Sequence, residues 1–243
     1  RVYNLRYELE DHYGNTLKYN FKVNGVKQAI PTPAECDNFM TWNLNNSFID
    51  RGFTLSIPRG NLYSNFCFEY DKTHNSKYFS DVHQINDSPI PLHNSANVWI
   101  KINTDTLQNR NNYGVVRINS NGSESWVGGE YNQGGLSLSV RELGDKYAIT
   151  ADKVAPTITP LAPENWASQK RIRVRLSDNL SGISSFRGEI NGEFVLFTHD
   201  SKSTIYTYQF DDERLSKGEK QTLIFTATDG AGNSSRYSYT FNY

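Results

Sequence analysis

The chain has 243 residues, a length that suits about two compact domains. Its 25 Lys and Arg residues nearly balance its 26 Asp and Glu residues, and the formal net charge of −1 gives no long-range field that would attract nucleic acid or an anionic membrane. The sequence contains no apolar stretch of roughly 20 residues, so we expect no membrane insertion. Fifteen Tyr and thirteen Phe residues against a single Met favour strands over helices. We therefore expect an all-β fold.

The first residue and the two cysteines indicate where the chain comes from. The chain begins at Arg1, and its opening residues are not a signal peptide, so we interpret it as part of a longer polypeptide. Cys36 and Cys67 are the only cysteines in the sequence. They either form a disulfide in an oxidising compartment or are small buried hydrophobic residues, and the sequence leaves both readings open.

An internal repeat relates the two ends of the chain. Residues 7–23 align without gaps on residues 225–241, and both copies contain the pattern D-x-x-G-N. An Asp side chain can accept hydrogen bonds from backbone amides two residues on, while Gly and Asn tolerate the positive φ of a tight turn. Each copy is therefore predicted to be a β-hairpin. The structural turn residues are Asp11, Gly14 and Asn15 in the first copy, and Asp229, Gly232 and Asn233 in the second.

The second hairpin closes a segment that begins at Ala155-Pro156 and has the size of an immunoglobulin-like sandwich. Asn191-Gly192 lies between two apolar runs and predicts a type I′ hairpin turn, in which both central residues have positive φ. Alternating patterns predict strands at residues 172–178, 184–190, 193–199, 204–210 and 221–229.

A second β-rich segment precedes Ala155-Pro156. Its predicted strands cover residues 53–63, 66–70, 96–103, 114–119, 126–140 and 146–152. We expect tandem β-sandwich modules, with a closing hairpin of a truncated or docked immunoglobulin-like module at 1–31, a middle β-sandwich domain at 32–153 and an immunoglobulin-like domain at 154–243. The alternative for the first segment is a complete hairpin added to the middle domain.

Four short motifs connect the sequence with a known family. They are I-P-R-G-N-L-Y at 57–63, W-V-G-G-E-Y at 126–131, D-N-L-S-G-I-S-S-F-R-G at 178–188 and the two D-x-x-G-N turns. Over nearly its whole length the chain resembles the C-terminal region of secreted bacterial proteins whose N-terminal domain is a lysostaphin-like zinc murein endopeptidase of peptidase family M twenty-three. The resemblance implies non-catalytic immunoglobulin-like modules, secreted to the periplasm of a Gram-negative bacterium or to the cell surface.

The zinc-binding motifs of that family are H-x-x-x-D and H-x-H, and the chain has no H-x-H. His83 and Asp87 have the H-x-x-x-D spacing, and His93 follows six residues later. These residues either bind zinc or lie in a polar, Pro-containing loop between strands. We expect the loop, no cofactor in this chain, and a zinc-dependent catalytic domain upstream of Arg1, so that the chain itself is not an enzyme.

Two weaker sets of candidate binding residues remain. Asp178-Asn179, the run 211–213 and the D-x-x-G-N turns could bind calcium through oxygen atoms, or could cap their own backbone. Trp166 is the best candidate for an exposed or interdomain aromatic residue, whereas Trp99 and Trp126 are expected in the core.

Two functions are compatible with these patterns. The chain either forms accessory β-modules that position or restrain the upstream catalytic domain, or is a stand-alone module for adhesion or binding. Its expected partners are that catalytic domain and peptidoglycan or another envelope glycan.

Overall fold

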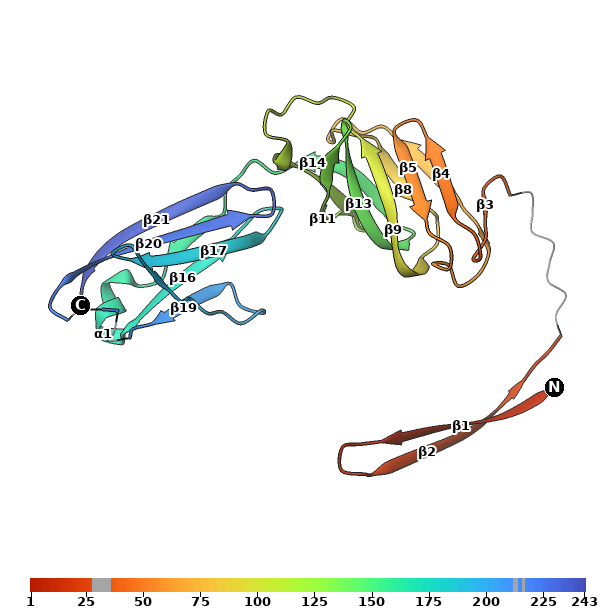
Figure 1. The fold of residues 1–243 in the computed structure, drawn as a ribbon, viewed down its shortest axis with the longest axis horizontal. Coiled ribbons are helices and arrows are strands. Elements are labelled where there is room, and N and C mark those ends of the chain that lie inside the picture. The colour runs from red at the N-terminus through yellow and green to blue at the C-terminus, as the bar shows by residue number, and fades with distance from the viewer. Residues whose placement is uncertain (28–35, 212–213, 216) are drawn as a thin grey trace. The chain divides into compact units, whose positions relative to one another are not determined.

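The computed structural model describes residues 1–27, 36–211, 214–215 and 217–243 (Figure 1). The chain divides into two compact units, Arg1–Cys36 and Asp37–Tyr243. The fold is all-β and consists of antiparallel sheets in sandwich modules, which confirms the predicted fold class. The expected boundary between residues 31 and 32 lies outside the described residues.

The first unit contains the predicted hairpin of β1 (Val2–Glu10) and β2 (Thr16–Asn24). Alternation places apolar side chains on one face and polar side chains on the other, because successive residues of a strand point to opposite sides. Tyr7 pairs with Tyr19 on the apolar face, and both rings are exposed, at 66% and 64% of their surface.

The middle of the second unit is a sandwich of two antiparallel sheets. Figure 1 shows β13, β9, β5 and β4 side by side in one of them. That sheet has the order β12 (Glu130–Asn132), β13 (Gly135–Leu143), β9 (Ile90–Lys101), β5 (Phe53–Ile57) and β4 (Asn46–Asp50). The other has the order β11 (Glu124–Gly128), β10 (Tyr113–Ile118), β14 (Lys146–Ala151), β8 (Val82–Ile85) and β7 (Tyr70–Thr73).

Alternating side chains of both sheets fill one hydrophobic core. Leu55 and Ile100 from one sheet and Val115 and Ile149 from the other have no exposed surface. Burying such side chains stabilises the fold by about 1.5–3 kcal/mol each. The 3-10 helix η1 (Arg110–Asn112) leads into β10.

The segment from His83 to His93 is mostly strand, so its interpretation as a loop was wrong. It contributes the end of β8 and the beginning of β9, with only residues 86–89 between them. His83 and Ile85 point into the core, while Val82 and Gln84 alternate with them at half-buried positions. His83 is a polar residue at an inward-facing position, and it therefore concealed the alternating pattern of β8.

A short strand pair lies at the beginning of the second unit, next to a disulfide. β3 (Phe39–Met40) pairs with β6 (Phe66–Cys67), and Phe39 lies opposite Cys67. Cys36 and Cys67 are joined by a disulfide, which decides between the two readings of the cysteines. Disulfides persist in oxidising compartments, so this bond indicates an extracytoplasmic protein. Within the described residues, no helix is long and apolar enough to cross a membrane.

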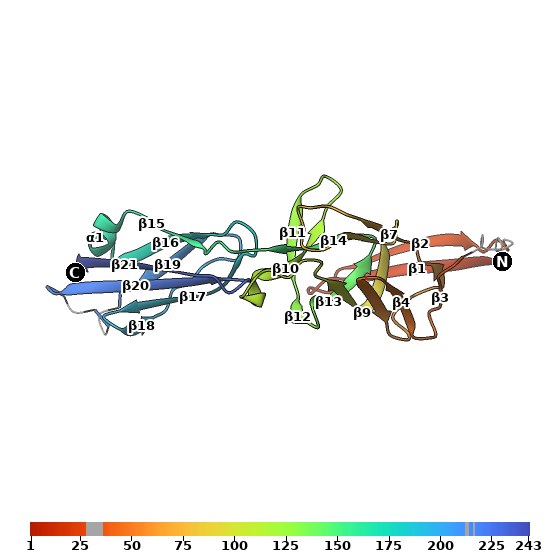
Figure 2. The ribbon, with the colours of Figure 1, turned by 90° about the horizontal axis from the view of Figure 1, so that it is seen from above.

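The C-terminal module is an immunoglobulin-like sandwich, as predicted. In Figure 2, β15 and β16 lie on one side of the module, and β17, β18 and β20 lie on the other. One sheet has the order β15 (Thr157–Pro160), β16 (Arg171–Ser177) and β19 (Ile205–Gln209). The other has the order β18 (Glu193–Val195), β17 (Ile183–Ile190), β20 (Lys220–Asp229) and β21 (Ser234–Asn242).

The turns of this module have the chemistry expected of them. Asn191 and Gly192 connect β17 to β18 with φ values of 53° and 87°, the positive range that a type I′ turn requires. Gly232, between β20 and β21, has a φ of 83°.

Trp166 belongs to the core, so the expectation of an exposed aromatic residue there was wrong. It begins the short helix α1 (Trp166–Gln169), which follows η2 (Pro163–Asn165), and only 2% of its surface is exposed. Its ring packs edge-on against Tyr239 and Phe241, and its Nε1 donates a hydrogen bond to the Leu161 carbonyl oxygen. The sequence around it carries no strand pattern, and the helix that covers the sandwich end was not predicted.

Candidate functional site

The D-x-x-G-N turn at the end of β20 holds its Asp side chain rigidly. Oδ1 of Asp229 accepts hydrogen bonds from the backbone amides of Ala231 and Asn233, at 2.9 and 2.8 Å, and Oδ2 accepts one from Asn233 Nδ2 at 2.8 Å. Asp11 makes the equivalent bonds in the first hairpin, to Tyr13 and Asn15. Those bonds hold the pKa of Asp11 below its usual value, the bond from the Asn15 side chain most strongly. The shared bonds explain why both turns use the same residues.

A second carboxylate comes from the turn between β16 and β17. Oδ2 of Asp178 accepts hydrogen bonds from the backbone amides of Leu180 and Gly182, at 3.0 and 2.8 Å. Its other oxygen, Oδ1, has less than 1 Å² of accessible surface and no hydrogen-bond donor among the described residues. Asn179, predicted beside it, is exposed.

The third carboxylate is that of Asp152, directly after β14, and it is buried with 1% of its surface exposed. Its Oδ1 accepts a hydrogen bond from the Val154 amide at 3.1 Å, and its Oδ2 accepts one from the Ser181 amide at 3.0 Å. The second of these bonds connects the end of the middle domain to the C-terminal module.

These three carboxylates form one acidic group, which we call the Asp triad. Asp152, Asp178 and Asp229 each offer an oxygen, and the three oxygens lie within 4.8 Å of one another. We searched the described residues for three or more potential metal ligands that lie close enough to share an ion, and the Asp triad is the group that meets this condition. An all-oxygen set of this kind suits a hard divalent cation.

Further contacts hold the loops of the Asp triad together. Asn233 Nδ2 donates to the Asp152 carbonyl oxygen at 3.1 Å, and Asn112 Nδ2 donates to Asn233 Oδ1 at 2.8 Å. Gly230 approaches Ser181 so closely that a Cβ at this position would lie 2.7 Å from the Ser181 carbonyl oxygen. Glycine is therefore required where the two loops meet.

Comparison with known proteins identifies the middle of the chain. Residues 37–152 match the model of a family described as the Zu5-like domain. These residues form a Zu5-like β domain of non-catalytic character. None of the curated proteins matches the chain. The matched region ends at Asp152, so the Asp triad joins the last residue of the Zu5-like domain to two loops of the immunoglobulin-like module.

The predicted zinc residues lie apart from this group, within the Zu5-like domain. His83 is buried in β8, with its ring stacked on Phe53 at a centroid distance of 5.1 Å and its Nδ1 2.7 Å from the Tyr70 hydroxyl. Burial lowers the pKa of His83 to about 4 and raises that of Tyr70. Asp87 and His93 are exposed, in the following loop and in β9.

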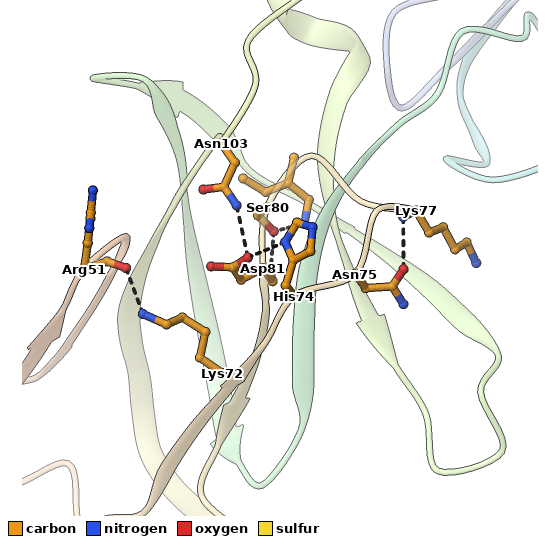
Figure 3. A network of polar contacts seen from close by, with 9 residues as sticks. Arg51, Lys72, His74, Asn75, Lys77, Ser80, Asp81 and Asn103 are labelled. Atoms are coloured by element: carbon orange, nitrogen blue, oxygen red, sulfur yellow. Dashed lines mark hydrogen bonds and ion pairs between the residues drawn. The ribbon is translucent and has the colours of Figure 1, made fainter.

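A polar network lies next to β8 (Figure 3). Asp81 Oδ1 accepts a hydrogen bond from Asn103 Nδ2 at 3.1 Å and lies 3.1 Å from Nδ1 of His74. The Ser80 hydroxyl donates to the Asp81 carbonyl oxygen and accepts from the Ile149 amide. The bond from Ile149 fixes the loop before β8 to β14, and the bonds of Asp81 connect the loop to residues just beyond the ends of β7 and β9, which is a structural task.

The remaining candidates are scattered. Trp99 and Trp126 are half-buried and do not belong to the hydrophobic core, so the expectation that they lie in the core was wrong. Each ring lies over a glycine of the adjacent strand, where a Cβ would be, at Gly135 and Gly114 respectively. Asp211 accepts a hydrogen bond from the Arg214 amide. Asp212 and Glu213 lie outside the described residues.

Asp152 was missed by sequence reasoning. Asp152 begins the sequence D-K-V directly before the Ala155-Pro156 boundary. Its position at the end of a domain is the one sequence feature that could have suggested a role for it. Asp178 and Asp229 were both proposed as calcium ligands, but from separate turns, and the fold brings them together.

Proposed function

We propose that the chain provides the non-catalytic accessory β-modules of a cell-envelope zinc metallopeptidase, a murein endopeptidase of family M twenty-three. The modules position or restrain a catalytic domain on the N-terminal side of the same polypeptide, and zinc belongs to that domain. The motifs at 57–63, 126–131 and 178–188 support this assignment. The disulfide, which requires an oxidising compartment, agrees with secretion to the periplasm or cell surface.

The observation that carries the proposal is the different burial of the two repeated hairpins. Phe225 and Tyr237 of the C-terminal copy pair as Tyr7 and Tyr19 do in the first copy. Phe225 is fully buried in the module core, whereas Tyr7 is exposed. An apolar sheet face needs a second layer to bury it. We propose that a further immunoglobulin-like module supplies this second layer to the first hairpin and connects the chain to the catalytic domain.

The natural polypeptide tests the proposal. We expect intact-mass measurement and sequencing of the secreted protein to reveal H-x-x-x-D and H-x-H motifs on the N-terminal side of residue 1. A signal peptide that leads directly into residue 1 would contradict the proposal.

A second candidate function is glycan binding, and a groove on the outer face of the Zu5-like domain favours it. The groove has a volume of about 600 Å³ and is lined by Trp99, Glu130, and the hydroxyl or amide groups of Thr54, Asn97 and Ser137. An aromatic ring beside polar groups can stack on a sugar and hydrogen-bond its hydroxyls.

Calorimetric titration with soluble murein fragments tests this candidate. Binding that Asn97→Ala weakens at least tenfold would support it. Binding that is absent, or unchanged in that variant, would exclude the groove as a glycan site.

A further inference from the structure

We propose that the Asp triad binds a calcium ion, and that the ion holds the Zu5-like domain to the immunoglobulin-like module. Asp152 comes from the end of the Zu5-like domain, and Asp178 and Asp229 come from two loops of the following module. This inference does not rest on the proposed accessory function.

The charge of the Asp triad requires a cation. Asp152 and Asp229 are buried, with 1% and 2% of their surface exposed, and Asp178 is partly buried beside them. The hydrogen bonds to these carboxylates that the structure describes come from neutral amide groups. Among the described residues, no Lys, Arg or His forms an ion pair with any of the three. Buried charges are ordinarily paired or coordinate a metal.

The unpartnered oxygen of Asp178 is an independent indication of a ligand. Backbone amides of its own turn satisfy Oδ2, whereas Oδ1 is sealed from solvent and has no donor among the described residues. Buried polar atoms almost always have a partner, and a carboxylate oxygen without one is costly. A cation shared with Asp152 and Asp229 supplies the missing partner.

The donor set and its spacing favour calcium. Ca²⁺ binds oxygen ligands at about 2.3–2.6 Å, so two ligands on opposite sides of the ion are separated by about 4.6–5.2 Å. The Asp triad presents three oxygens within 4.8 Å, and carbonyl oxygens or water would complete the coordination. Zn²⁺ prefers nitrogen and sulfur ligands, and Mg²⁺ requires a tighter octahedral arrangement that usually retains several waters.

The extracytoplasmic location of the protein determines which calcium affinity the site needs. The disulfide indicates an extracytoplasmic protein, and extracellular calcium modules bind with dissociation constants of about 10⁻⁴–10⁻³ M. A site of modest affinity therefore responds to calcium there. Loss of the ion would leave three carboxylates repelling one another across the joint, and the two modules would separate more readily.

The repeat provides a matched control. Asp11 makes the same hydrogen bonds in its turn as Asp229, and it lies outside the Asp triad. Asp178→Asn removes one charge of the Asp triad but keeps an oxygen that can accept the bonds from Leu180 and Gly182. Asp11→Asn makes the same chemical change at the control position.

The first experiment is calorimetric titration of the EDTA-treated chain with CaCl₂, combined with thermal unfolding. We expect one Ca²⁺ per chain, a rise in Tm of roughly 5 °C at saturation, and much weaker binding of Mg²⁺. Asp178→Asn should weaken binding at least tenfold, and Asp11→Asn should leave it unchanged. Circular dichroism establishes that each variant is folded.

Absence of Ca²⁺ binding by the folded wild-type chain at 10 mM CaCl₂, a concentration roughly tenfold above the weakest dissociation constants of such modules, would overturn the proposal without any variant. Equal binding by Asp178→Asn, or equal affinity for Mg²⁺, would also overturn it. If Asp178→Asn does not fold, Asp152→Asn replaces it, because its amide keeps one acceptor oxygen in the same position.

Cleavage by trypsin after Lys153, an exposed residue directly beyond Asp152, tests the effect on the joint. We expect Ca²⁺ to slow this cleavage at least fivefold in the wild-type chain and to have no effect in Asp178→Asn. A cleavage rate that is the same with Ca²⁺ and with EDTA would contradict a role in holding the modules together.

Discussion

Asn112 donates a hydrogen bond from Nδ2 to Oδ1 of Asn233 at 2.8 Å, although 121 positions separate the two residues in the chain. Asn112 is the last residue of η1 in the Zu5-like domain, and Asn233 ends the D-x-x-G-N turn of the immunoglobulin-like module. Asn233 also donates to the Asp152 carbonyl oxygen. One side chain of the repeated turn thus connects the two modules.

The first prediction concerns this side chain. Asn233→Ala removes its bonds to Asn112 and Asp152, and each such bond contributes about 1 kcal/mol. We expect tryptic cleavage after Lys153 to become at least fivefold faster, as measured by mass spectrometry. Asn15→Ala changes the same position of the first hairpin and should leave that cleavage rate unchanged. Equal acceleration by both variants would show that the effect does not arise at the joint.

The second prediction concerns pH. Burial lowers the pKa of His83 from 6.5 to about 4 in the folded chain, so the unfolded chain binds more protons between these values. The contribution of His83 to the free energy of unfolding should therefore fall by about 3 kcal/mol as pH decreases from about 6.5 to about 4. Urea unfolding at several pH values measures this dependence.

His83→Phe serves as the control, because Phe keeps the stacking on Phe53 and does not titrate. Its free energy of unfolding should vary less over the same pH range, by the share that His83 contributes. An unchanged pH dependence would assign the acid sensitivity to other groups.

The third prediction concerns the tryptophan rings that cover glycines. A Cβ at Gly114 would overlap the Trp126 ring, so Gly114→Ala should destabilise the Zu5-like domain by about 1–3 kcal/mol. In a Trp126→Ala background the same substitution should be neutral or stabilising, because the ring is gone and Ala is favoured over Gly within a strand. A double-mutant cycle measured by urea unfolding tests this coupling. Additive effects would show that the two residues do not interact.

The fourth prediction concerns the disulfide. Cys36 and Cys67 close a loop of about 30 residues, and the chain-entropy relation then gives a stabilisation of about 3–4 kcal/mol. Replacing both cysteines by Ser should lower the free energy of unfolding by that amount. The wild-type chain under reducing conditions should match the double variant, and a difference of less than 1 kcal/mol between oxidised and reduced wild type would contradict the expectation.

The sequence was most informative where side chains alternate regularly. Residues 221–229 and the Asn191-Gly192 turn could be predicted because local chemistry determines both. His83 interrupted the pattern of β8, since a polar residue at a buried position conceals a strand. Trp166 was misjudged because the short helix that buries it leaves no strand pattern.

The Asp triad could be predicted only in part. Turn chemistry explained Asp178 and Asp229 individually, since each accepts hydrogen bonds from its own turn. Their proximity to Asp152 depends on the packing of two loops around Gly230, and no local pattern contains that information.

The proposed role of these modules is to serve a murein endopeptidase without catalysing hydrolysis themselves. The most direct measurement is murein hydrolysis by the natural secreted polypeptide, by the same polypeptide without residues 1–243, and by residues 1–243 alone. We expect the first to cleave peptide cross-links in a zinc-dependent manner, the second to cleave with altered rate or regulation, and the third to be inactive. Hydrolysis by residues 1–243 alone, or none by the natural polypeptide, would contradict the account.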